Sequence, residues 1–189
     1  MRKRLFLVAL LAAAAACSSD SRPRAAEKPG DALSDGQVLG VLAAADQAEL
    51  DFTRAAMATT SDPVVREFAG MMVEQHTAGL VKAKQAAAAA GLGADNSAVA
   101  ARLRDGADAA AKTSTASDLD FMCAQIRMHR GLLSTIDATL APAAADARVK
   151  ALLDETRPLV ASHFDRARSI IQNLTSTSSD EACVAHGGA

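Results

Sequence analysis

Four side chains of metal-binding type lie near the middle of four separate helical stretches: Glu49, His76, His129 and His163. Each belongs to a pattern of apolar residues at helical spacing. His76, for instance, follows Phe68 and Met72 by eight and four positions, and residues so spaced share one face of a helix. That apolar face is the one that packs into a core. All four side chains are therefore predicted to point inward.

The midpoints of packed helices lie at one level whether neighbouring helices run parallel or antiparallel, so the four side chains are expected to meet. Three imidazoles and a carboxylate suit one transition-metal ion such as Zn, Cu or Fe. Such an ion would also offset the cost of burying Glu49. Asp46 and Gln125 each lie one turn before a candidate ligand, and we expect them to support the ligands by hydrogen bonds. Asp46 is also a candidate ligand, and either residue could instead lie at the boundary of the core.

A metal-free interpretation stays open. A single histidine in mid-helix is more often a hydrogen-bonded core residue than a ligand, and Glu49 could pair with a protonated histidine in a buried polar layer. A two-metal site is not supported, because di-iron bundles carry Glu-x-x-His pairs. The residues three positions before the histidines are Val73, Ile126 and Val160.

Methionine thioethers select Cu(I), which keeps copper among the candidates, although methionine is also an ordinary filler of helical cores. His186, in the C-terminal sequence VAHGGA, is not expected to take part. The methionines concerned are Met57, Met71, Met72, Met122 and Met128.

The elements that must position these residues are predicted to be long helices. Ser34 and Gln37 have the spacing of a capping box, Pro63 suits a first helical turn, and Gly91 suits a helix end. The alanine and leucine content favours helix, and alternating strand patterns are absent from the sequence. We predict an all-α protein whose helices span about residues 34–59, 63–90, 118–140 and 146–174.

The connections predict how these helices are arranged. Short links join the first helix to the second and the third to the fourth, so each pair forms a hairpin. The segment 92–117 is long enough to run along the whole molecule and contains a short helical stretch at about 97–111. Two hairpins joined by one long crossover form a ferritin-like four-helix bundle, and a plain up-down bundle is the alternative. Pro158 is expected to divide the fourth helix, with a bend just before His163.

Residues 1–16 have the features of a signal peptide, since a basic start precedes an apolar run of 12 residues that is too short to span a membrane. Small residues before Cys17 resemble a lipobox, in which the peptide is cut before a cysteine that becomes lipidated. Ordinary secretory cleavage with a free Cys17 is the alternative. Residues 17–33 form a polar tether with two prolines and a glycine. The four-helix domain is then expected at 34–175 and a C-terminal tail at 176–189.

These features predict a lipoprotein of the cell envelope that faces the periplasm and is held to a membrane by its lipid. Ser18 after Cys17 is typical of lipoproteins sorted to an outer membrane. Three of the 20 basic residues lie in the signal, so the remaining chain carries 17 basic and 22 acidic residues, a net charge of −5. This balance, with no Trp and no Tyr, argues against a nucleic-acid-binding protein.

Cys123 and Cys183 remain once Cys17 is assigned to the lipid. Two cysteines in an exported protein are expected to oxidise. The start of the third helix and the end of the fourth lie together in a hairpin, so a disulfide would hold the tail against the helices. A buried Cys123 thiol with a loose tail is the alternative.

Three stretches together resemble an exported bacterial family, domain of unknown function 4142. They are REFAGMMVEQHTAG, DLDFMCAQIRMHRGLL and RPLVASHFDRA, at residues 66–79, 118–133 and 157–167. The resemblance covers about residues 36–174 and implies a ferritin-like fold. It carries over His76, His129, His163 and Pro158, and less specifically Glu49, but it carries no activity. The 118–133 stretch is also similar to a sister family with paired histidines that suggest copper, although Arg130 follows His129 here.

The leading functional hypothesis is an envelope lipoprotein that binds one transition metal in order to buffer, sense or sequester it. A metal-free structural or interaction module is the alternative. A metal-dependent oxidoreductase is a third hypothesis, which requires an open coordination position and a pocket that reaches it.

Replacing Cys17 tests the lipoprotein assignment. We predict that Cys17→Ser shifts the exported protein from the detergent phase to the aqueous phase in detergent partitioning, because the lipid attachment atom is lost. Mass spectrometry of the wild-type N-terminus should show a diacylated cysteine. An unmodified cysteine in the wild-type protein would contradict the assignment.

Overall fold

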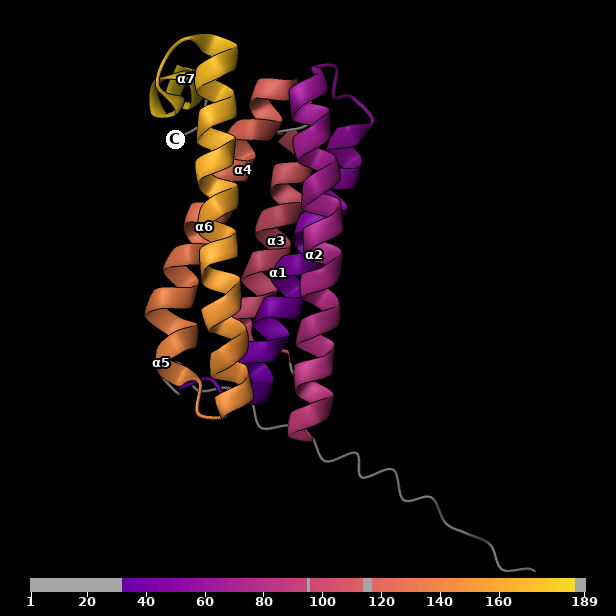
Figure 1. The fold of residues 1–189 in the computed structure, drawn as a ribbon, viewed down its shortest axis with the longest axis vertical. Helices are drawn as coiled ribbons and strands as arrows, with labels where there is room; N and C mark the ends of the chain where they lie inside the picture. Colours follow the sequence, from indigo (N-terminus) through magenta and orange to yellow (C-terminus); the bar gives the residue numbers. More distant parts are fainter. Residues whose placement is uncertain (1–31, 95, 114–116, 186–189) are drawn as a thin grey trace, which may run out of the picture.

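The computed structural model describes residues 32–94, 96–113 and 117–185, except the side chains at 111 and 113. This described part is helical and contains no strand (Figure 1), which confirms the all-α prediction. The predicted signal peptide 1–16, Cys17, most of the tether 17–33 and His186 lie outside the described residues. None of the described helices combines the length and apolar character that a membrane span requires.

Three of the long helices begin and end within two residues of their predicted bounds, whereas the helical run from Asp118 continues to Ala143, past its predicted end at 140. Ser34 and Gln37 form the capping box of the first helix, and the Asp62 side chain accepts hydrogen bonds at the start of the second. Gly91 ends that helix with a φ of 67°, which glycine adopts without strain. The helices are α1 (Asp35–Met57), α2 (Pro63–Ala90), α3 (Ala98–Thr113), α4 (Asp118–Thr135), η1 (Ile136–Leu140), α5 (Ala141–Ala143), α6 (Ala147–Thr175) and α7 (Ser179–Ala185).

The two internal prolines are accommodated differently. Before Pro142 the chain widens into the π-helical turn η1, which suits a proline that cannot donate to the carbonyl four residues earlier. Around Pro158, by contrast, α6 is continuous. The expected division of this helix into two segments is therefore wrong. Pro158 lies on the exposed face, where the carbonyl oxygen that loses its partner can bond to water.

Two hydrogen-bonded corners fix the directions of the helices. Asp118, at the start of α4, accepts bonds from the backbone N–H groups of Ser61 and Asp62 just before α2. Asp35, at the start of α1, accepts bonds from the backbone N–H groups of Ala145 and Asp146 just before α6. Thus α2 and α4 begin at one end of the molecule, while α1 and α6 begin at the other.

The helices pack as two antiparallel pairs that share a long interface. α1 packs on α2, α4 packs on α6, and α2 and α6 join the pairs. In sequence α3 lies between the two pairs, and in space it packs along α1 (Figure 1). Each hairpin expected from a short link is present.

The buried apolar residues form two clusters, one toward each end of the molecule. One cluster contains the first half of α1, the second half of α2, η1 and the first half of α6. The other contains Phe52, Phe68, Phe121 and the second half of α6. Between the two clusters lies a layer of buried polar residues, in which each long helix contributes one side chain of metal-binding type. These are Glu49, His76, His129 and His163, with exposed fractions of 3%, 4%, 2% and 2%.

The C-terminal segment is ordered as a short helix, where only a tail was expected. α7 packs against α4 and α6, and Cys183 in α7 forms a disulfide with Cys123 in α4. Arg130 of α4 also forms an ion pair with Asp180 at 3.0 Å. The disulfide closes a chain segment with a sequence separation of 60 residues.

We predict that Cys123→Ser/Cys183→Ser lowers the free energy of unfolding by about 2–4 kcal/mol, because the cross-link restricts the unfolded chain. Urea unfolding followed by circular dichroism measures this loss. A reductant should lower the unfolding midpoint of the wild-type protein and leave that of the double variant unchanged. Equal midpoints for the two oxidised proteins would contradict the prediction.

Candidate metal centre

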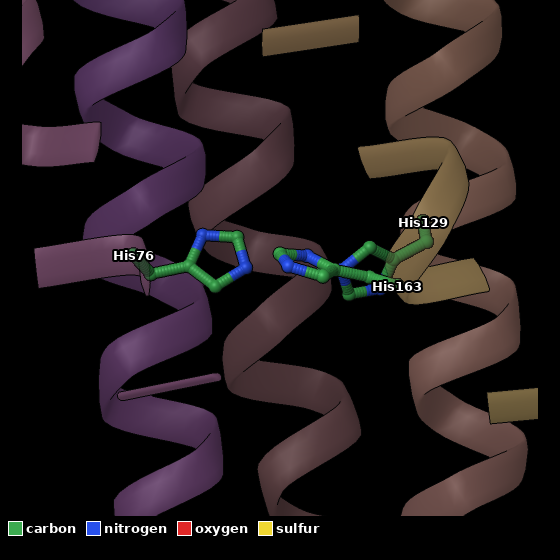
Figure 2. Close-up of side chains that lie close together, drawn as sticks. All are labelled: His76, His129 and His163. Carbon is green, nitrogen blue, oxygen red and sulfur yellow. The ribbon is translucent and has the colours of Figure 1, made fainter. Parts of the chain in front are cut away.

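Three histidines from three helices face one another in the layer between the apolar clusters. His76 lies on α2, His129 on α4 and His163 on α6, and their ring centroids are 5.2–5.8 Å apart. Figure 2 shows the three rings turned toward a common point, with one nitrogen of His76 directed at the other two rings. One nitrogen from each ring lies within 4.8 Å of the other two. The sequence spacing correctly indicated that these side chains point inward.

The outer nitrogen of His76 and that of His129 each contact a fixed hydrogen-bond acceptor. His76 Nδ1 lies 2.9 Å from Asp46 Oδ1, and a carboxylate can only accept. His129 Nδ1 lies 2.9 Å from the backbone carbonyl oxygen of Gln125. Both Nδ1 atoms therefore carry the ring hydrogen. The Nε2 atoms of these two rings are left with lone pairs, and His76 Nε2 is buried without a hydrogen-bond partner.

His163 has its hydrogen on the opposite nitrogen. Its Nε2 lies 2.5 Å from Gln75 Oε1, a contact that two acceptors do not make without a hydrogen between them. Its Nδ1, which lies 3.2 Å from His129 Nε2, is thus unprotonated. The three rings consequently direct three lone pairs at one another, while their N–H groups point away to acceptors. Ligand histidines in metal sites have this hydrogen-bonding pattern.

Two of the three histidines in this centre have lowered pKa values. Burial, with the nearby positive charges of protonated His129 and His76, lowers the pKa of His163 to about 3. Burial also lowers the pKa of His129, although the negative charge of Glu49 opposes the shift. Burial raises the pKa of Asp46, against the hydrogen bond from His76. The imidazoles of His129 and His163 are therefore neutral at neutral pH, the form in which histidine binds metals.

The spacing of the nitrogens is close to that of a metal site. Ligand nitrogens of a tetrahedral zinc ion are about 3.3 Å apart, and His129 Nε2 and His163 Nδ1 already lie 3.2 Å apart. The three ligand atoms all lie within 4.8 Å of one another, so the group would have to tighten to hold such an ion.

Glu49 is buried in the same layer but lies outside the three-histidine group. Its Oε1 accepts a hydrogen bond from Thr53 at 3.0 Å and one from Gln125 Nε2. Gln125 therefore supports Glu49 by its side chain and His129 by its backbone carbonyl. Asp46 supports His76 by a hydrogen bond, whereas the sequence placed it one turn before Glu49 as a supporting residue, a candidate ligand or a boundary residue.

Three contributors were not identified from the sequence. Gln75 bonds to His163 from a neighbouring helix, which only the packing could reveal. Thr53 lies one turn after Glu49, a spacing that was available in the sequence. Gly79 lies so close to Asp46 that a Cβ there would come within 2.8 Å of both carboxyl oxygens. A glycine inside a helix was the available signal for such a close approach.

Two pockets reach the histidines from different sides. The larger, about 310 Å³, lies among α1, α3 and α4 and is lined by Glu49, His76 and His129. The smaller, about 130 Å³, lies between α2 and α6 and is lined by His76 and His163. The histidines are therefore buried, yet both pockets give access to them.

The buried methionines belong to the apolar core. Met72 and Met122 are fully buried in the cluster that contains Phe68 and Phe121. The described metal-ligand group consists of the three histidines. Packing accounts for these two methionines, as core fillers do.

We predict that Gly79→Ala lowers the free energy of unfolding of the metal-free protein by about 1–2 kcal/mol, because the added methyl group displaces Asp46 from His76. Urea unfolding in the presence of EDTA measures this loss. In an unobstructed helix the same change stabilises by about 0.5–1 kcal/mol. Gly70→Ala, on the same helix with nothing within 4 Å of the new Cβ, is the matched control and should raise the urea midpoint. If Gly79→Ala raised the midpoint as Gly70→Ala does, the close contact would not constrain Asp46.

Comparison with known proteins places the chain in a family. A family model described as Domain of unknown function (DUF4142) matches residues 20–170, a range that includes His76, His129 and His163. No curated protein and no solved structure matches the chain. The resemblance expected from the three sequence stretches is thereby confirmed, and the chain belongs to the DUF4142 family.

Proposed function

We propose that this protein is an exported envelope lipoprotein whose helical bundle binds one transition-metal ion through His76, His129 and His163. The lipid on Cys17 would hold it to a membrane, facing the periplasm, with the polar segment 17–33 as a tether. In this position the bundle would buffer, sense or sequester the metal.

The observation that carries the proposal is the convergence of three lone pairs in a buried layer. Each outer N–H group already has an acceptor, namely Asp46, the Gln125 carbonyl or Gln75. Buried polar atoms without partners are costly, and His76 Nε2 is such an atom. A cation at the common point would satisfy all three nitrogens at once.

The charges around the centre also suit a divalent ion. The imidazoles of His129 and His163 bring no charge, while Asp46 and Glu49 are carboxyl groups close to the centre. Two carboxylates balance one divalent cation. Glu49 remains a candidate fourth ligand, and imidazole with carboxylate suits Zn, Cu or Fe.

We further propose that the bundle is ferritin-like. Support comes from the directions of the helices, since α1 and α6 begin at one end while α2 and α4 begin at the other. This is the order produced by two hairpins and a crossover. The residues three positions before the histidines are Val73, Ile126 and Val160, so the site supports one metal rather than a di-iron pair.

A metal-dependent enzyme is the second candidate, and the larger pocket favours it. Catalytic metal sites keep a coordination position open beside three protein ligands, and a pocket of about 310 Å³ reaches His76 and His129. A metal-free structural module would follow if the purified protein held no metal.

Metal content tests the proposal. We predict about one equivalent of a single transition metal, by mass spectrometry of the full chain purified without chelator or histidine tag. The His76→Ala/His129→Ala/His163→Ala variant should contain none, whereas His186→Ala is a control that should retain the metal. Asp46→Ala should weaken the affinity about 10–100-fold, as loss of a partner of a ligand histidine does.

Folding of each variant is checked by circular dichroism and urea unfolding, so that loss of metal is not mistaken for loss of structure. No metal in the wild-type protein, even after incubation with Zn, Cu(II) and Fe(II), would overturn the metal proposal.

A further inference from the structure

We propose that the larger pocket binds a small organic anion with an apolar body, whose anionic group reaches the metal as an added ligand. The inference rests on the proposed metal site and extends it by naming a ligand class. It also assigns the wall of that pocket, made by α3 and α4, a role in binding.

The pocket opens to the surface, since exposed residues such as Arg102 and Gly131 are part of its lining. It measures about 310 Å³, or about ten water volumes. Its size is at the lower end of small-molecule sites. It therefore has room for about ten non-hydrogen atoms.

Small side chains produce this space. The wall consists largely of alanine and glycine from three helices, where longer side chains would fill the gap. These residues are Ala45, Ala48, Gly106, Ala107, Ala110, Ala124 and Gly131. Leu103, Met128 and Leu132 complete an apolar surface that would contact the body of a ligand.

The buried side of the pocket is chemically different. His76 and His129 line it, and His76, which is 4% exposed, has an Nε2 without a partner. A ligand lying in this pocket thus comes into reach of the nitrogens that would hold the metal. This unpartnered buried nitrogen at the end of the apolar pocket distinguishes the pocket from a packing defect.

The charges indicate an anion. Arg102 lines the pocket from an exposed position on α3, and Glu49 is the carboxyl group among the lining residues. With a divalent ion at the histidines balanced by Asp46 and Glu49, the charge of Arg102 would leave the pocket with a net positive charge. A carboxylate or hydroxamate group would therefore be favoured over an amine.

The smaller pocket does not suit the same ligand. It measures about 130 Å³, about four water volumes, and it contains the ion pair between Lys82 and Glu155 at 2.7 Å. Its small size and this ion pair suit water or the ion itself. The two sides of the centre thus differ in what they admit.

The test uses the full chain loaded with Co(II), whose visible absorption reports its ligands, and two probes. Benzohydroxamate has about ten non-hydrogen atoms and an apolar ring, while acetohydroxamate has the same metal-binding group without the ring. We expect benzohydroxamate to bind at least about tenfold more tightly, because its ring is buried in the pocket.

Filling the pocket should remove this preference. Gly106→Leu/Gly131→Leu adds side chains at two lining positions where a Cβ meets nothing within 4 Å, and it should lower benzohydroxamate affinity at least about tenfold while cobalt content stays unchanged. Gly70→Leu has the same open surroundings but lies outside the pocket, so it is the matched control and should bind like the wild type.

The outcomes separate the two proposals. If cobalt binds but the two hydroxamates bind equally, or if filling the pocket changes neither affinity, the pocket inference is overturned and the metal site stands. Removal of cobalt by both probes would also overturn the inference, since the site could not hold metal and ligand together. If the wild-type chain binds neither cobalt nor Zn, Cu(II) or Fe(II), the metal proposal fails and the pocket inference fails with it.

Discussion

The arrangement of ring hydrogens in three buried histidines is the constraint on which the proposed chemistry depends. His76 gives its Nδ1 hydrogen to Asp46, His129 gives its own to the Gln125 carbonyl, and His163 gives its Nε2 hydrogen to Gln75. Because each N–H group points outward, the remaining lone pairs point inward. His129 Nε2 and His163 Nδ1 lie 3.2 Å apart, and two lone pairs at this distance repel one another unless a proton or a metal ion lies between them. A polar layer built only for hydrogen bonding would have the opposite pattern, with N–H groups donating across the centre.

The rest of the fold holds the partners of these hydrogen bonds in position. The layer lies between two apolar clusters, so each long helix is packed on both sides of its polar residue. The corners at Asp35 and Asp118 fix how the helix ends meet, and the disulfide holds α7 near the start of α4. Gly79 permits the approach of Asp46 to His76, which a larger residue would obstruct. Stability and the geometry of the centre therefore depend on the same contacts.

The sequence was sufficient where local chemistry decides the structure. Helical spacing indicated which way the histidines point, and Ser34 and Gly91 marked a helix start and a helix end. It was insufficient where packing between helices decides. The bond from Gln75 to His163 crosses from α2 to α6, and no pattern within α2 indicates it. The continuity of α6 through Pro158 depends on that face being exposed, which is also a property of the folded molecule.

Nitrogen NMR of the histidine side chains in the zinc-loaded protein tests the central claim most directly. Long-range proton–nitrogen correlations distinguish metal-bound, protonated and free ring nitrogens. The account predicts metal-bound Nε2 at His76 and His129, metal-bound Nδ1 at His163, and a hydrogen on the other nitrogen of each ring. Side-chain nitrogen shifts that do not change when zinc is added, or a hydrogen on one of the three inward nitrogens, would contradict it.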